Sequence, residues 1–115
     1  MDLDGTSNFY DLTVHIKSLE QPTDFALGEN YPNPFNPSTS FDVVLPEDSI
    51  VDLKIYNLQG QLVTTLSSGS ELRWGRHSFQ WDGTNAQGLQ VSSGVYILSM
   101  KAGDFEDSHK MMLLK

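Results

Sequence analysis

The stretch YPNPFNPSTSFDVVL, from Tyr31 to Leu45, joins two patterns that together indicate a β fold. Its first part holds three prolines in the seven residues from Tyr31 to Pro37. Its second part places Phe41, Val43 and Leu45 at alternate positions, which is the pattern of a strand with one buried face. Proline lacks a backbone donor, so it occurs at strand starts and at sheet edges. We therefore predict a strand that begins after a proline-rich lead-in.

The lead-in itself is constrained by its prolines. A residue before proline is driven toward extended or polyproline II backbone, and here those residues are tyrosine and asparagine. We predict a stiff, extended segment from Tyr31 to Pro37 that crosses one end of the core and buries the rings of Tyr31 and Phe35. The asparagine amides are expected to bond the loose backbone. The segment is then either a rigid connector that caps the core or a recognition surface.

Period-two alternation recurs along the chain. It marks strands at Tyr10–Ile16, Val51–Ile55, His77–Trp81 and Gly94–Ala102, a weaker strand at Leu62–Leu66, and a closing apolar run at Met111–Leu114. Turn residues separate these strands at Pro46–Asp48, Asn57–Gly60, Ser67–Ser70, Asp82–Gly88, Ser92–Gly94 and Ala102–Asp104. Short strands at this spacing, without an amphipathic helix, are typical of sandwiches. We predict an all-β, immunoglobulin-like antiparallel β-sandwich of about seven strands.

The first residues differ from the rest of the chain. Residues 1–18 contain an acidic start and one strand pattern, and we interpret them as the end of an upstream domain or as an extra edge strand. Residues 19–24 are interpreted as a linker, and residues 25–115 as the sandwich domain. The start of the chain is acidic, where a signal peptide would be basic, so we expect the chain to be an excised C-terminal piece of a longer protein, with any export signal outside it.

Composition excludes several classes of function. The 115 residues contain no cysteine, which rules out disulfides, thiolate zinc sites and cysteine nucleophiles. Fifteen acidic residues face seven lysines and arginines, for a net charge of -8. Binding to nucleic acid or to anionic membranes depends on basic side chains, so neither is expected. No apolar run approaches the length of a membrane span, so we expect no membrane insertion.

Metal and catalytic chemistry find little support in the sequence. Asp82 and Asn85 lie in one loop and are the best candidate metal ligands, but Ca²⁺ takes six to eight oxygens. The alternative is a tight turn in which Asp82 bonds the backbone and Gly83 and Gly88 adopt positive φ. The three histidines are far apart in sequence, and adjacent carboxylates on a strand point to opposite faces. We therefore predict neither an enzyme nor a cofactor.

Aromatic residues leave a binding function open. Trp74, Trp81, Tyr31, Tyr56 and Tyr96 are the candidates for a sugar-binding platform. Trp81 falls in a strand pattern and is expected in the core. Trp74 lies in a turn and is the better candidate for contact with a ligand, although it can instead fold back over the sheet edge.

Four motifs, LGENYPNPFNPSTSF, VDLKIYNLQGQLVTTL, WDGTNAQGLQVSSGVYILSMKAG and KMMLLK, occur in this order along the chain. With them, the run from Phe25 to Lys115 resembles the type A C-terminal sorting domain of the type IX secretion system. It is also similar to the immunoglobulin-like domain of the flagellar hook-capping family. The resemblance implies an exported cargo that the outer-membrane translocon recognises, with a surface protease that cuts between Ser18 and Asn30. It further implies a Gram-negative bacterium and delivery through the periplasm to the cell surface or medium.

The resemblance also points to recognition residues. They lie in the proline-rich box and in the last strand, and they are Asn33, Pro34, Phe35, Asn36, Pro37, Lys110, Met111, Met112, Leu113, Leu114 and Lys115. The last strand is expected to be an edge strand whose free backbone groups offer a template to a partner. We expect a monomer. The alternatives to sorting are an accessory extracellular binding module, for carbohydrate among other ligands, and a structural assembly domain.

Overall fold

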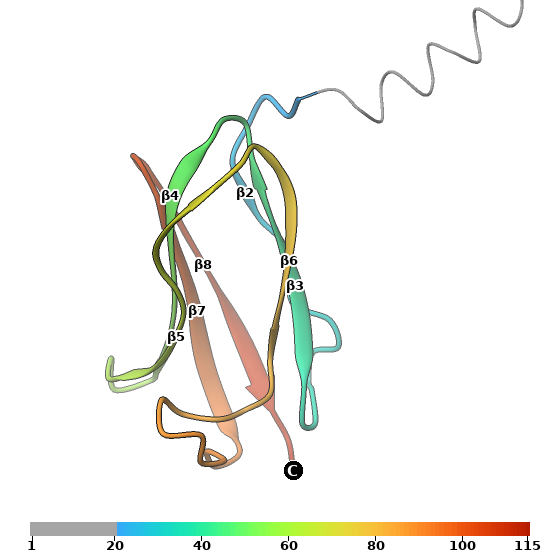
Figure 1. The fold of residues 1–115 in the computed structure, drawn as a ribbon. Helices are drawn as coiled ribbons and strands as arrows, with labels where there is room; N and C mark the ends of the chain where they lie inside the picture. The colour runs from blue at the N-terminus through green and yellow to red at the C-terminus, as the bar shows by residue number, and fades with distance from the viewer. Residues whose placement is uncertain (1–20) are drawn as a thin grey trace, which may run out of the picture.

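The computed structural model describes residues 21–115 of the chain, which form an all-β sandwich (Figure 1). Its seven strands are β2 (Ala26–Leu27), β3 (Thr39–Leu45), β4 (Ser49–Asn57), β5 (Leu62–Leu72), β6 (Gly75–Trp81), β7 (Gly94–Ala102) and β8 (Phe105–Leu113). One sheet has the order β2-β3-β6 and the other β5-β4-β7-β8, and all pairings are antiparallel. The predicted fold class is therefore confirmed.

The core lies between the inner faces of the two sheets. Alternate residues of β3, β4 and β7 are fully buried, as the period-two patterns predicted. Phe41 of β3 stands opposite Phe79 of β6, and their rings stack with centroids 5.8 Å apart. Trp81 is 1 % exposed and meets Tyr96 edge-on at 5.2 Å. Burial of these large apolar side chains is the main favourable term for folding.

Strand β5 corrects one prediction. The residues Ser67–Ser70 were expected to form a turn, but they lie inside β5, where the register with β4 shifts at a bulge. Gly69 takes φ +65°, and its N–H donates to Asp52 Oδ1 at 2.7 Å. The buried Ser67 hydroxyl donates to the carbonyl of Val51 at 2.9 Å. A bulge tolerates the same small residues as a turn, so the local sequence could not separate the two.

The last strand is longer than predicted. It begins at Phe105, directly after a tight turn in which Gly103 takes φ +60°, and it ends at Leu113. Leu114 and Lys115 lie beyond it, although both were expected in the strand. Its first part is mostly polar because β8 is an edge of its sheet and presents side chains to solvent.

The start of the domain contains a short strand that the sequence did not signal. Ala26–Leu27 pairs with Val43 and Val44 of β3, and the N–H of Gly28 donates to the carbonyl of Asp42 at 2.8 Å. The assignment of residues 1–18 lies outside the described residues. The linker at 19–24 and the domain start at 25 stay predictions.

Candidate protein-recognition surface

The proline-rich segment Tyr31–Pro37, here called the proline loop, is folded back on itself. Tyr31 forms an isolated antiparallel bridge with Ser40, with N–H to carbonyl distances of 2.8 and 3.0 Å. All three X-Pro peptide bonds are cis. Because Tyr31 pairs with Ser40, the chain returns to its starting point within one loop, and the expectation of an extended lead-in is wrong.

A small buried network holds the base of this loop. Thr39 is 1 % exposed, and its hydroxyl donates to the carbonyl of Pro32 at 2.8 Å. The amide of Asn30, which is 5 % exposed, donates to the Thr39 hydroxyl at 3.0 Å. The Thr39 hydroxyl thus satisfies a loop carbonyl that has no partner in a sheet.

The two aromatic rings of the proline loop have opposite environments. Phe35 is 2 % exposed and packs against Trp81 with centroids 5.5 Å apart, as predicted. Tyr31 is 82 % exposed, so its predicted burial is wrong. Directly paired residues share a face of a sheet, and Tyr31 pairs with Ser40, whose side chain faces solvent. The ring of Tyr31 therefore lies on the same solvent-exposed face as Ser40.

The proline loop lies along the edge of β8. The side-chain amide of Asn33 acts like a neighbouring peptide: its Oδ1 accepts from Met112 N at 2.9 Å, and its Nδ2 donates to the Lys110 carbonyl at 3.4 Å. The backbone of Phe35 continues this ladder. Its N–H donates to the Met112 carbonyl at 2.9 Å, and its carbonyl accepts from Leu114 N at 3.0 Å. The structure thus joins the two predicted recognition segments into one surface.

The first half of β8 is covered by residues just before the proline loop. Phe25 and Phe105 stack at 5.3 Å, and His109 Nε2 lies 2.7 Å from the carbonyl of Leu27. The last strand is an edge strand, as expected. The carbonyl of Lys110, both backbone groups of Met112 and the N–H of Leu114 already have partners in the proline loop, however, so this part of the strand is not a free template.

Only some of the predicted recognition residues reach the surface. Phe35, Met111 and Leu113 are buried in the core and hold the proline loop and β8 on the sandwich. The exposed ones are Asn33, Pro34, Asn36, Pro37, Lys110, Met112, Leu114 and Lys115. Between loop and sheet they border a shallow groove of about 210 Å³, lined by Asn33, Pro34, Val95, Lys110, Met111 and Met112.

In the loop after β6, the side-chain oxygens of the two candidate metal ligands, Asp82 and Asn85, accept hydrogen bonds within the loop. Asp82 Oδ1 accepts from the hydroxyl and the N–H of Thr84 at 2.6 and 3.2 Å, and Asn85 Oδ1 accepts two backbone N–H groups at 3.0 Å. Gly83 and Gly88 take φ +77° and +82°, in agreement with the tight-turn alternative. Within residues 21–115, no three His, Asp or Glu side chains are grouped as metal ligands would be.

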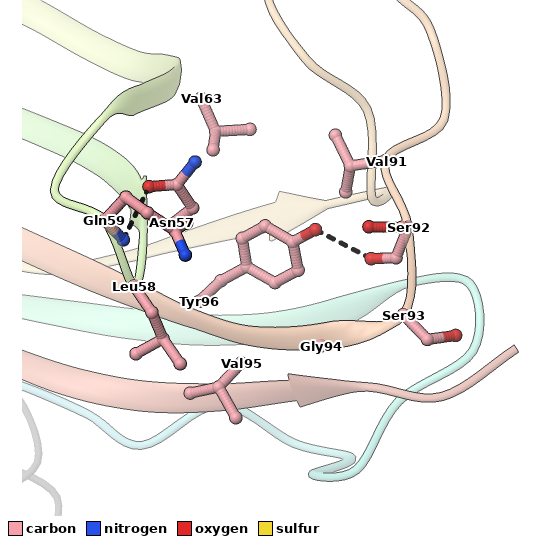
Figure 2. Close-up of a pocket in the computed structure, with 10 residues that line it drawn as sticks. All are labelled: Asn57, Leu58, Gln59, Val63, Val91, Ser92, Ser93, Gly94, Val95 and Tyr96. Atoms are coloured by element: carbon pink, nitrogen blue, oxygen red, sulfur yellow. Dashed lines mark hydrogen bonds between the residues drawn. The ribbon is translucent and has the colours of Figure 1, made fainter.

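A second hollow, of about 400 Å³, lies between the β4–β5 turn and the start of β7 (Figure 2). Tyr96 points into it and donates its hydroxyl to the carbonyl of Ser92 at 2.7 Å. Leu58 and Val95 point the other way, to the outer side of the sheet (Figure 2). The sequence analysis did not single out Leu58 or Val95 as surface residues. Val95 carries the outward parity of β7, which its alternation with Tyr96 could have signalled.

The outer face of the smaller sheet carries a charged network. Asp42 Oδ1 accepts from the Ser78 hydroxyl at 2.7 Å, and its Oδ2 accepts from Arg76 Nη1 at 3.0 Å. These two hydrogen bonds, with the charge of Arg76, hold the pKa of Asp42 below its ordinary value. The pair is exposed and contributes little to stability.

The sequence profile of the FlgD Ig-like domain family matches residues 33–105, which is more than half of the chain. The chain belongs to this family. The match begins inside the proline loop at Asn33 and ends at Phe105, so it stops before the part of β8 that the loop covers. No curated protein sequence matches the chain.

Three solved structures share the fold of this FlgD Ig-like domain. Dimeric latent PorU from Porphyromonas gingivalis matches with a TM-score of 0.59 and 20 % identity, covering 83 % of this chain and 10 % of that one. PorZ, a surface component of the type IX secretion system of the same organism, matches with a TM-score of 0.53 and 17 % identity, covering 85 % of this chain and 12 % of that one. FlgD from P. aeruginosa matches with a TM-score of 0.51 and 22 % identity, covering 65 % of this chain and 57 % of that one. The chain thus spans about a tenth of PorU and PorZ.

The aromatic residues of this FlgD Ig-like domain are not gathered into a platform. Trp81 and Tyr96 are buried in the core, as Trp81 was predicted to be. Trp74 is 40 % exposed in the β5–β6 turn, where its N–H donates to Asp48 Oδ1 at 2.9 Å. Tyr31 belongs to the proline loop at the other end of β3. The geometry therefore does not favour a sugar-binding site.

Proposed function

We propose that this FlgD Ig-like domain is a non-catalytic C-terminal sorting domain. It directs an exported cargo through the outer-membrane type IX secretion machinery to the cell surface or medium. Its partners are the translocon and a surface protease that removes the domain. Its recognition surface consists of the proline loop together with the second half of β8.

The hydrogen-bonded junction of these two segments is the observation that carries the proposal. A sorting signal read in the folded state needs a defined, preorganised surface. Four hydrogen bonds from Asn33 and Phe35 fix the proline loop on β8. Gln21, at the start of the described chain, bonds the carbonyl of Pro46 in the β3–β4 turn, at the end of the sandwich opposite the C-terminus (Figure 1). A cargo that precedes the domain would therefore leave this surface accessible.

The structural neighbours support the same system. PorZ is described as an essential surface component of the type IX secretion system, and it contains a region with this fold.

In the part of the chain that the structure describes, we find no apolar helix of membrane-spanning length.

A reporter fusion tests the proposal. The 115-residue chain would be placed behind a signal peptide and a fluorescent protein, in a bacterium with the type IX machinery and in its translocon-null mutant. The informative variant is Asn33→Ala, which removes both side-chain bonds to β8. The matched control is Ser67→Ala, which removes one hydrogen bond of β5, the edge strand at the opposite side of the sheet order from β8.

Sorting predicts reporter at the surface or in the medium only when the translocon is present. It also predicts that Asn33→Ala is retained in the periplasm while Ser67→Ala is exported, with both purified domains folded. A reporter that stays periplasmic with the folded wild-type domain would refute sorting. The structural assembly role, which the family and the FlgD structure favour as the second candidate, would then lead.

A further inference from the structure

The outer face of the larger sheet differs from the rest of the domain. Strand register sets Tyr56 beside Ile97 and Ile97 beside Lys110, and it sets Val95 beside Met112. All of these side chains have the outward parity of their strands. We call this surface the basic–apolar face, and its residues are Lys54, Tyr56, Leu58, Val95, Ile97, Lys110 and Met112.

Positive charge is concentrated on this sheet in an otherwise acidic chain. Of the seven lysines and arginines, Lys54, Lys101 and Lys110 lie on its outer side. Lys101 pairs with Glu106 at 3.9 Å, and the carboxylate of Asp52 is bonded to the N–H at the β5 bulge. Within residues 21–115, neither Lys54 nor Lys110 has a carboxylate at salt-bridge distance. These two ammonium groups are therefore available to an outside partner.

Apolar side chains lie next to these lysines. Leu58 is 63 % exposed and Met112 is 41 % exposed, and Val95 stands between them in the sheet order. Figure 2 shows Leu58 and Val95 pointing together away from the core. The surface is continuous with the proline loop, because Val95 and Met112 also line the groove beside Pro34.

We infer that the basic–apolar face is the docking surface for a translocon protein segment that carries apolar side chains beside carboxylates. The inference rests on the proposed function and names the chemistry of the partner. The apolar side chains of the segment cover Leu58, Val95 and Met112, and its carboxylates meet Lys54 and Lys110. A flat apolar centre with a charged rim is the usual anatomy of a protein interface. The charge pairs steer the encounter and fix its register.

The opposite face of the domain offers no such match. On the smaller sheet, the side chain of Arg76 is already bonded to Asp42 at 3.0 Å. Directly beside it on β3 lies one half-buried apolar residue, Val44, and the other outward residues of β3 and β6 include Ser40, Ser78 and Gln80, which are polar and uncharged. Arg73 lies nearby in the β5–β6 turn, so Arg73 and Arg76 provide a charge-matched control on another part of the surface.

The test compares two double charge reversals in the reporter fusion. Lys54→Glu/Lys110→Glu should lower translocon-dependent export about tenfold or more, as expected for a loss of at least one decade in affinity. Arg73→Glu/Arg76→Glu changes net charge equally and should export like the wild type. Melting temperatures of both purified variants establish that they are folded. A photo-crosslinking residue in place of Ile97 should give an adduct that contains a translocon subunit, whereas one in place of Ser78 should not.

The outcomes separate this inference from the proposed function. If the wild type is exported through the translocon and both double variants export equally, the docking surface is wrong while sorting stands. If the wild type itself is not exported, sorting fails first. Lysine-dependent binding of the purified chain to lipopolysaccharide micelles, without a crosslink at position 97, would overturn a protein partner. Lysine-dependent dimers in light scattering would do the same.

Discussion

Replacing Phe35 by alanine tests whether one buried ring holds the proline loop on the sandwich. The ring is 2 % exposed and packs against Trp81 at 5.5 Å. Truncation of a fully buried phenylalanine costs about 3–5 kcal/mol, from lost transfer free energy and from the cavity that remains. A domain of this size has about 5–15 kcal/mol of stability in total. Phe35→Ala should therefore remove a large share of it and leave a marginal fold.

The assay is urea denaturation of the 115-residue chain. Unfolding is monitored by tryptophan fluorescence, because Trp81 is buried and reports core unfolding. Tyr31→Ala is the matched control, since it truncates the other aromatic ring of the same loop. Tyr31 is 82 % exposed, so its truncation should change the free energy of unfolding by no more than about 0.5 kcal/mol. Hydrogen exchange adds a local readout, because the amides of Met112 and Leu114 are bonded by the loop.

The expected result is a large loss for Phe35→Ala, together with faster exchange at Met112 and Leu114. Two results would refute the reasoning. One is a loss below about 1 kcal/mol, or equal to that of Tyr31→Ala, because the ring would then not be a core residue. The other is a large loss with unchanged protection of both amides under native conditions, because the loop would then stay on β8 without its anchor.

Two further predictions concern a turn and an ion pair. Gly83→Ala places a Cβ 3.3 Å from the Pro37 carbonyl at φ +77°, whereas Gly60→Ala at φ +83° meets open space. Gly83→Ala should therefore be less stable than Gly60→Ala by about 1 kcal/mol or more in urea, and equal losses would contradict the contact. The pKa of Asp42 is lowered by the Ser78 hydrogen bond and the nearby arginine, so its stabilisation is complete above pH 3.8 and is lost as pH falls through the lower folded value. Asp42→Asn should weaken the acid dependence of the melting temperature slightly, and parallel curves would count against this.

The strands followed from local sequence to the extent that one face of each is buried. Phe41, Val43 and Leu45 alternate because the side chains of a strand point to opposite faces, and every second one enters the core. The first part of β8 gave no such signal, since an edge strand can be polar along most of its length. The residues Ser67–Ser70 suggested a turn because serine and glycine suit turns and bulges equally. What decided between them was Asp52, which lies on another strand.

The sequence alone determined the sandwich class and the buried faces of β3, β4 and β7, because periodicity acts over a few residues. The two segments of the candidate surface were indicated by the resemblance of their motifs to a known family. Only the tertiary structure decided that Asn33 meets Met112, 79 residues away, and that Phe35 rather than Tyr31 is buried. It also placed Lys54 and Lys110 on one face. Such contacts depend on the order in which strands pair, and the closure of long loops is set by the whole core rather than by any local pattern.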